Sequence, residues 1–291
     1  MSTVIGVDLG GTKIALGRFD AITWELQEES RMETHAHKSF SHVYQDMLLQ
    51  IASLRQADTI AIGIGVPGLV HQPDGVIVTM PNIPGGEGFA LKKNLEHDTN
   101  LPVDADNDAN CFALAEAVEG TGKGHSVFVG VSMGTGVGGG IVIDGKIFRG
   151  AHGFAAEIGH MLLKPGEPPF PTNNKRGEVE QFLSGTAFGK RCDAAKKPEE
   201  YMEGEVCEFM RPDVFKEVAW MCTSITHLLD PTMIAFGGSA GRALKPHLHQ
   251  IKASLEEWAL PGTPLPELAI AELPHAAILG AALLTRSSKD S

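Results

Sequence analysis

Two short glycine-rich segments carry the residue types that proteins use to hold phosphate groups. Residues 8–13 read Asp-Leu-Gly-Gly-Thr-Lys, and residues 134–136 read Gly-Thr-Gly. Glycines let the backbone approach a phosphate closely, and successive N–H groups can then cradle it. An ordinary hairpin turn would explain either segment alone. Two such turns in one chain favour phosphate binding.

The side chains of the first segment add to this interpretation. Asp8 can hold a magnesium ion, directly or through water, because hard oxygen ligands suit that metal. Thr12 supplies a hydroxyl donor and Lys13 a positive charge. The candidate phosphate-binding residues of the two segments are Asp8, Gly10, Gly11, Thr12, Lys13, Gly134, Thr135 and Gly136.

Asp108 is the candidate catalytic base. It lies in the run Asn107-Asp108-Ala109-Asn110, where a helix over residues 107–118 is predicted to begin. By base rate, a lone aspartate at such a place caps the helix. The alternative is a general base that accepts a hydroxyl proton, and a helix N-terminus favours the ionised form that a base requires. Phosphoryl transfer depends mainly on positioning and charge, so one well-placed carboxylate suffices.

Glu157 and His160 form a second candidate site. They are three residues apart, so in a helical turn they would share a face, and both suit hydroxyl recognition. A surface glutamate with a structural histidine is the ordinary alternative, and a metal-binding role for His160 would need partners. Glu180 precedes Ser184-Gly185, and on its own it is read as a solvated helix residue.

The elements that position these residues can be predicted from hydrophobic patterning. Residues 4–9 and 13–19 predict two strands joined by the first glycine turn, whereas a dinucleotide-binding unit would open a helix there. Residues 40–54 predict an amphipathic helix capped by Ser39 or Ser41, and residues 59–66 predict a buried strand.

A second copy of the opening pattern follows. Residues 126–132 and 138–143 predict strands around the second glycine turn, and Asp144-Gly145 predicts a hairpin to residues 146–148. A helix is expected over 214–229, a strand over 233–236 and an apolar helix over 276–284. The repeated strand–turn–strand pattern predicts a duplicated architecture.

Composition limits the classes of function. The chain has 291 residues, 36 acidic and 24 basic, with a net charge of -12, which argues against nucleic-acid or membrane-surface binding. No apolar run approaches the roughly 18 residues of a membrane span, and no leader pattern is visible. Four scattered cysteines without a Cys-x-x-Cys pair predict reduced thiols and a cytoplasmic location.

The ordered set of motifs resembles the ROK family of sugar kinases and related repressors. The resemblance covers nearly the whole chain. Besides the segments above, it rests on residues 81–85, 134–140, 157–160, 184–185, 236–238 and 279–282. It implies an actin-like, ribonuclease H-like ATPase fold, in which two α/β domains flank a central cleft. We expect a small N-terminal domain of residues 1–117 plus about 275–291, and a larger domain of residues 118–274.

The resemblance also implies roles for individual residues. Asp108 would take the proton from the sugar hydroxyl. ATP and Mg²⁺ would lie against the two glycine turns, with Gly237 and Gly238 near the nucleotide. The implied sugar contacts are Asn107, Glu157, His160 and Glu180, together with Gly68 and Asn82. A homodimer is expected on the same basis.

The chain departs from the family at one motif. Many members carry a Cys-x-Cys-Gly-x-x-Gly-Cys zinc motif just before the third sugar-binding glutamate. Here the three cysteine positions hold Pro171, Asn173 and Glu178, and only Gly177 and the flanking Arg176 survive. Because zinc needs about four ligands, we predict no structural zinc.

The leading functional hypothesis is an ATP-dependent hexose kinase, with glucose phosphorylated at its 6-hydroxyl. N-acetylglucosamine, N-acetylmannosamine, fructose and mannose are alternative substrates. A sugar-sensing repressor would need a DNA-binding segment before the kinase-like part, and the first glycine turn follows Asp8, which leaves no room for one. A catalytically silent, sugar-responsive regulator is the third possibility, against which Asp108 and both turns speak.

Overall fold

The computed structural model describes residues 2–195 and 198–286. Its internal contacts divide the chain into two compact units. Unit 1 comprises Met1–Ala115, Ile147–Ala155 and Pro274–Ser291, and unit 2 comprises Glu116–Lys146 and Ala156–Leu273. The domain boundaries expected from sequence place residues 147–155 in the second domain and stay a prediction; residues 287–291 of that expectation lie outside the described residues.

Unit 1 is built on a five-stranded sheet in the order β3-β2-β1-β4-β7. Strand β1 is antiparallel to β2 and parallel to β4, which is in turn parallel to β7. The elements are β1 (Thr3–Leu9), β2 (Lys13–Asp20), β3 (Leu26–Glu33), α1 (Phe40–Leu54), β4 (Thr59–Val66), β5 (Leu69–His71), β6 (Val76–Thr79), α2 (Leu91–Thr99), β7 (Val103–Asn107), α3 (Asp108–Val118) and α10 (Ala276–Leu284).

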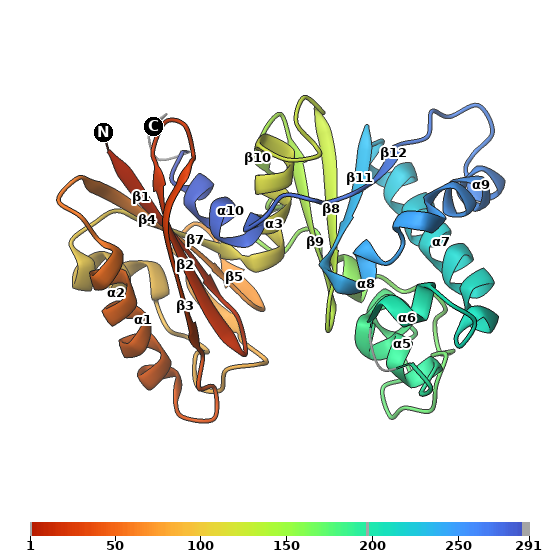
Figure 1. The fold of residues 1–291 in the computed structure, drawn as a ribbon, viewed down its shortest axis with the longest axis horizontal. Helices are drawn as coiled ribbons and strands as arrows, with labels where there is room; N and C mark the ends of the chain where they lie inside the picture. Colours follow the sequence, from red (N-terminus) through yellow and green to blue (C-terminus); the bar gives the residue numbers. More distant parts are fainter. Residues whose placement is uncertain (1, 196–197, 287–291) are drawn as a thin grey trace. The chain divides into compact units, whose positions relative to one another are not determined.

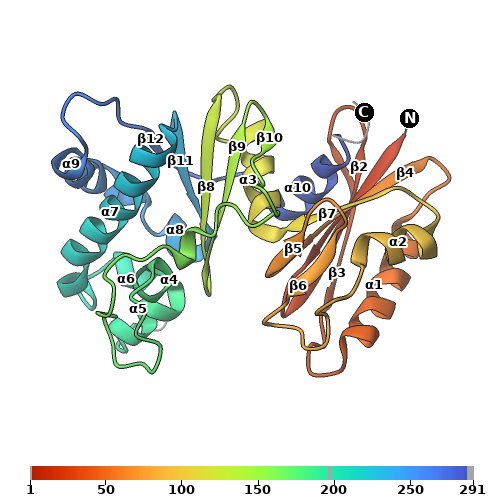
Figure 2. The same ribbon diagram turned by 180° about the vertical axis from the view of Figure 1, so that it is seen from behind.

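Helices cover both faces of this sheet. In both views α1 and α2 lie on one face and α10 on the other (Figures 1 and 2). Helix α1 begins after Ser39, whose side chain accepts a hydrogen bond from the backbone of His42. Glycines let α10 approach the sheet closely: a Cβ atom on Gly63 would lie 1.7 Å from the carbonyl oxygen of Ala281. The buried side chains between the sheet and helices α1 and α2 form one hydrophobic core.

Unit 2 repeats the sheet topology of unit 1. Its order is β10-β9-β8-β11-β12, with β8 antiparallel to β9 and parallel to β11, which is parallel to β12. The predicted duplication is therefore confirmed. The elements are β8 (Val127–Met133), β9 (Val137–Ile143), β10 (Lys146–Ile147), η1 (Ile158–His160), α4 (Val179–Leu183), α5 (Gly185–Arg191), α6 (Pro198–Met202), η2 (Glu208–Met210), α7 (Arg211–Leu229), β11 (Met233–Gly237), α8 (Gly238–Arg242), η3 (Lys245–His247), α9 (Leu248–Trp258) and β12 (Glu267–Ile270).

Helices α7 and α9 lie on one face of this second sheet (Figures 1 and 2). They share a second hydrophobic core with β8 and β11, separate from that of unit 1. Helix α7 ends where Asp230 adopts a left-handed conformation just before Pro231. Each unit therefore has its own sheet, core and glycine turn.

The prediction of reduced thiols is wrong for one pair of cysteines. Cys192 and Cys207 form a disulfide, whereas Cys111 and Cys222 are free and buried. The fold brings the Cα atoms of the pair to 6.0 Å, a spacing that a disulfide bridges. Their separation of 15 residues along the chain does not reveal this proximity.

Within residues 2–195 and 198–286, none of the helices combines the length and the apolar character that crossing a membrane requires.

Candidate functional site

The first glycine turn of unit 1 presents backbone and short polar side chains at one end of the β1–β2 hairpin. The amide of Gly10 donates to the carbonyl of Lys13 at 3.0 Å, and the Thr34 hydroxyl donates to the carbonyl of Gly10 at 2.6 Å. A Cβ on Gly11 would lie 2.7 Å from the Cβ of Asn82, so glycine is required there for Asn82 to approach. Thr12 and Lys13 are exposed beside this turn.

Asp8 lies near the end of β1, just before the turn. Burial, and secondly the negative charge of Asp108, raise its pKa from 3.8 to about 7. Two carboxylates that repel each other in this way fit a cation between or beside them. In the described part of the chain, no group of three or more His, Cys, Asp and Glu side chains is arranged to hold a metal ion. Mg²⁺ at Asp8 would therefore take its remaining ligands from water and phosphate oxygens.

Asp108 is the first residue of α3, as the sequence indicates. The cap at this end is made by its neighbour: the side-chain oxygen of Asn107 accepts from the amides of Ala109 and Asn110 at 2.9 and 3.3 Å. The Asp108 carboxylate also accepts from the Ala109 amide, at 2.8 Å. Because Asn107 fills the capping role, the ordinary explanation for an aspartate at this position loses force.

Asn107 and Gly68 are joined directly. The side-chain amide of Asn107 donates to the carbonyl of Gly68 at 2.9 Å, and Gly68 has a φ of +90° that favours glycine. The nitrogen and the oxygen of the Asn107 side chain thus both help to fix the backbone around Asp108. A sugar contact by either residue stays a prediction.

Asp106 is a structural residue of this site that sequence reasoning missed. It is buried, and its carboxylate accepts three hydrogen bonds: from Arg149 Nε at 2.6 Å, from Asn110 Nδ2 at 2.8 Å and from the backbone N–H of Asn107 at 2.8 Å. These bonds fix the start of α3 and with it the backbone of Asp108. Arg149 is 43 residues away along the chain, so no sequence spacing indicates the pair.

The second glycine turn, in unit 2, is held by hydrogen bonds to its backbone and by the close approach of neighbouring glycines. The amide of Gly134 donates to the carbonyl of Gly136 at 2.9 Å, and the amide of Gly185 donates to the carbonyl of Gly134 at 2.8 Å. The Thr186 hydroxyl donates to the carbonyl of Thr135. Gly238 has a φ of +74°, and a Cβ on it would lie 2.3 Å from the carbonyl of Met133. The Gly237–Gly238 pair therefore lies against this turn.

Glu180 packs over the same turn. Its carboxylate accepts from the amide of Val137 at 2.8 Å, and a Cβ on Gly136 would lie 2.4 Å from its Oε2 atom. A glycine is needed at position 136 to leave room for the Glu180 side chain. This steric reason for the glycine is separate from phosphate binding by the turn.

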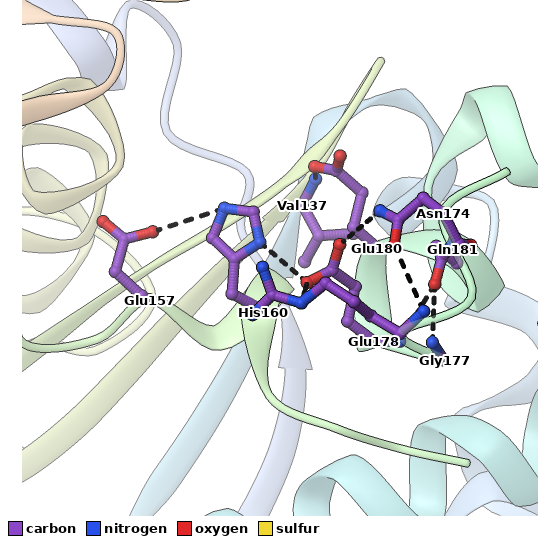
Figure 3. Close-up of polar contacts among 9 residues, drawn as sticks. Val137, Glu157, His160, Asn174, Gly177, Glu178, Glu180 and Gln181 are labelled. Atoms are coloured by element: carbon purple, nitrogen blue, oxygen red, sulfur yellow. Dashed lines mark hydrogen bonds and ion pairs between the residues drawn. The ribbon is translucent and has the colours of Figure 1, made fainter. Parts of the chain in front are cut away.

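Glu157, His160 and Glu180 gather in unit 2 (Figure 3). Glu157 precedes the short helix η1, and its Oε2 atom lies 4.0 Å from Nε2 of His160. Burial raises the pKa of Glu157; the nearby His160 lowers it and the charge of Glu180 raises it. The Glu157 and His160 side chains remain 41% and 55% exposed, so both can reach a ligand. Carboxylate oxygens and an imidazole nitrogen at such spacing suit the hydroxyl groups of a sugar.

The structure therefore groups the predicted residues into two sets, each described within its own unit. Unit 1 contains the first turn, Asp8 and Asp108, with Asn82, Asn107 and Gly68. Unit 2 contains the second turn and the Gly237–Gly238 pair, with the Glu157, His160 and Glu180 cluster. The chemical role of each residue stays a prediction.

The sequence of this chain is similar to those of known sugar kinases, and it matches one protein family over nearly its whole length. The chain matches the ROK family over residues 4–288. It is 34% identical over 260 residues to an N-acetyl-D-glucosamine kinase of Erwinia tasmaniensis, covering 80% of this chain and 82% of that protein. It is 32% identical over 289 residues to a glucokinase of Halalkalibacterium halodurans, covering 88% and 86%.

A solved structure gives the same result for the fold. The ROK family glucokinase of Streptomyces griseus, determined in complex with glucose and AMPPNP, is 29% identical, with a TM-score of 0.78. The match covers 98% of this chain and all of that one.

Proposed function

The chain belongs to the ROK family, and from this premise we propose that it is a sugar kinase that transfers a phosphoryl group from ATP to a hexose, with glucose as the substrate and glucose 6-phosphate as the product. The observation that carries the proposal is Asp108 at the start of α3, beside Asp8 and with its capping role filled by Asn107. The actin-like α/β fold is shared with the solved glucokinase structure, and all three relatives described above are named as kinases.

In the proposed reaction, Asp108 accepts the proton of the attacking sugar hydroxyl. The helix N-terminus favours its negative charge, and the Asp106 network keeps its backbone in place. The hydroxyl oxygen then attacks the terminal phosphorus of ATP, and ADP leaves. Phosphoryl transfer of this kind needs positioning and charge neutralisation more than covalent catalysis.

Both glycine turns suit the phosphates of the nucleotide. Backbone amides of the first turn, with Thr12 and Lys13, offer donors and a positive charge. In unit 2, the Gly134–Gly136 turn, whose Thr135 is exposed, and the adjacent Gly237–Gly238 pair offer glycine backbone. Mg²⁺, held by Asp8 with phosphate and water oxygens, would neutralise phosphate charge.

Glu157, His160 and Glu180 are the proposed sugar ligands, with Asn82, Asn107 and Gly68 as further contacts. Carboxylates accept hydrogen bonds from hydroxyl groups, and imidazole can accept or donate. Replacing Glu157 or His160 is therefore expected to weaken sugar binding.

A kinase for N-acetylglucosamine is the second candidate. It is favoured by the identity to the Erwinia tasmaniensis enzyme, which is 34% over 260 residues, against 32% over 289 residues for the glucokinase. N-acetylmannosamine, fructose and mannose remain further alternatives.

We also propose that the protein is a homodimer and that it acts in the cytoplasm. With glucose as its substrate, it would catalyse the entry of glucose into glycolysis.

The substrate is tested with a coupled assay of ADP release over a panel of glucose, mannose, fructose, N-acetylglucosamine and N-acetylmannosamine. Glucose is expected to give the highest kcat/KM, and omitting Mg²⁺ is expected to abolish turnover. A higher kcat/KM for N-acetylglucosamine would replace the first candidate by the second. Absence of sugar-dependent ADP release with every sugar would contradict the kinase.

A further inference from the structure

Glu178 is a buried carboxylate beside the proposed sugar ligands. Its side chain is only 7% exposed, and it directly precedes α4, the helix that carries Glu180. A buried carboxylate is costly unless it is paired and hydrogen-bonded. The partners that surround it therefore indicate what holds it there.

Three side chains meet the Glu178 carboxylate (Figure 3). His160 Nδ1 lies 3.1 Å from its Oε2 atom, and Arg176 Nε lies 3.3 Å from the same oxygen. The side-chain amide of Asn174 donates to Oε1 at 3.2 Å. Of these partners, His160 belongs to the proposed sugar site and the other two belong to the loop before α4.

The segment that carries Glu178 is itself tightly fixed. Gln181 accepts from the amides of Gly177 and Glu178 at 2.7 and 3.2 Å, and donates to the carbonyl of Asn174 at 2.7 Å. Gly177 has a φ of +70°, and a Cβ on it would lie 1.8 Å from the carbonyl of Lys164. The hydrogen bonds of Gln181 and the close approach at Gly177 thus fix the backbone that carries Glu178.

The chemistry of the contact sets the state of the imidazole. An ionised carboxylate only accepts hydrogen bonds, so the ring nitrogen that faces it, Nδ1, must carry the proton. In the neutral ring, Nε2 is then an acceptor. It lies 4.0 Å from the Glu157 carboxylate, outside hydrogen-bond distance, on the exposed part of the ring. Nε2 and the Glu157 carboxylate together can accept from two neighbouring hydroxyl groups of one sugar.

We propose that Glu178 is a positioning residue for sugar recognition: its carboxylate fixes the Nδ1–H tautomer and the orientation of His160, so that Nε2 faces the sugar beside Glu157. The segment 174–181 then serves two of the proposed sugar ligands, because Glu178 holds His160 and α4 holds Glu180 on the amide of Val137. The inference rests on the proposed sugar kinase function, and it assigns to Glu178 a role at a position where the family's zinc motif has a cysteine.

The test combines nitrogen NMR of the histidine side chains with sugar kinetics. The resonance of His160, among 12 histidines, is assigned by its loss in His160→Asn. The full-length wild-type protein is expected to show the Nδ1–H tautomer of His160. Glu178→Ala is expected to lose that tautomer preference and to raise the KM for the best sugar of the panel about tenfold, with a smaller change in kcat. Glu178→Gln keeps an acceptor oxygen and is expected to restore most of the KM.

Two matched controls separate orientation from loop stability. Arg176→Ala removes the other charged partner of Glu178 and is expected to change neither tautomer nor KM. Gln181→Ala loosens the turn without touching the ring; it is expected to lower the Tm and leave the tautomer intact. Unchanged tautomer or unchanged KM in Glu178→Ala would overturn the proposal. So would a Gln181→Ala variant whose KM rises as much as that of Glu178→Ala.

Failure of the positioning role can be distinguished from failure of the proposed function. The NMR spectrum is recorded without substrate, so it reports on the Glu178–His160 contact whether or not the protein phosphorylates a sugar. If no sugar in the panel supports ADP release or binds in calorimetry, the proposed function is wrong and the positioning role is wrong with it.

Discussion

At the scale of single residues, the two carboxylates of unit 1 differ in what surrounds them. Asp8 is partly buried near the end of β1, and its pKa is raised to about 7 by burial and by the charge of Asp108. Asp108 lies at a helix N-terminus, with the Ala109 amide as a donor. A group at the edge of ionisation near neutral pH is easily converted to the charged form by a cation, as a magnesium ligand requires.

Asp8 should make the stability of the ligand-free protein fall as pH rises. The pKa of Asp8 is about 7 in the folded protein and 3.8 in the unfolded chain. Between pH 3.8 and pH of about 7, the folded state therefore binds more protons than the unfolded state. The free energy of unfolding therefore decreases with pH over this window because of Asp8. In Mg²⁺-free buffer, denaturant unfolding of Asp8→Asn is expected to show a weaker decrease than the wild type from pH 4 to pH 8.

The exposed turn variant Asp144→Asn serves as the control for this titration, and it should retain the wild-type slope. A slope in Asp8→Asn equal to that of the wild type would show that Asp8 does not titrate in this range.

At the scale of elements, close backbone contacts fix how helices meet sheets. Helix α10 approaches β4 where Gly63 has no side chain, and the carbonyl of Ala281 occupies the space that a Cβ would fill. Because the clash involves backbone atoms, it cannot be relieved by a rotamer change. Either the helix or the strand must shift.

Gly63→Ala is therefore expected to destabilise the protein by about 1–3 kcal/mol or more, as overpacking in a core does. Ile60→Ala, at a partly exposed position of the same strand, is the control and should have a smaller effect. The measurement is the midpoint of thermal or urea unfolding of both variants. A Gly63→Ala midpoint equal to the wild-type value would contradict the packing of α10 on the sheet.

Strongly patterned elements were predictable from sequence, and the weakly patterned ones were not. Helix α1 and its Ser39 cap, the β1–β2 hairpin and α10 follow from apolar periodicity and turn residues. Strand β3 alternates poorly because its residues are largely polar, and its place at the sheet edge explains its exposure. Helix α2 is short and rich in charged residues, so tertiary contacts decide its formation.

The candidate site shows the same limit. Local motifs indicated the glycine turns, Asp108 and the Glu157–His160 pair. The contacts that orient them, Arg149 on Asp106 and Glu178 on His160, join residues 43 and 18 apart, which only the fold brings together.

At the scale of the whole molecule, the same sheet topology occurs twice and gives each unit one glycine turn. The units differ in what accompanies the turn. Unit 1 places the carboxylates of Asp8 and Asp108 there, and unit 2 places the cluster of Glu157, His160 and Glu180. The loop before α4 is ordered in unit 2 by Gln181, Gly177 and the partners of Glu178.

The residues at the positions of the family's zinc motif predict that the purified chain lacks structural zinc. The positions of the family's cysteines hold Pro171, Asn173 and Glu178, which offer a single strong ligand, whereas zinc needs about four. Elemental analysis of protein expressed in zinc-supplemented medium should find far less than one zinc per chain. Stoichiometric zinc that survives dialysis against a chelator would overturn this expectation.

The role of Asp108 as catalytic base is tested most directly by measuring kcat and sugar affinity together for Asp108→Asn. The asparagine keeps an oxygen that can accept from the Ala109 amide, so the helix start should persist, while the ability to take a proton is lost. We predict that kcat falls by about 10²- to 10⁴-fold, the usual contribution of a general base, and that the sugar Kd from calorimetry stays close to the wild-type value. Near-normal kcat in this variant would contradict the assignment of the base.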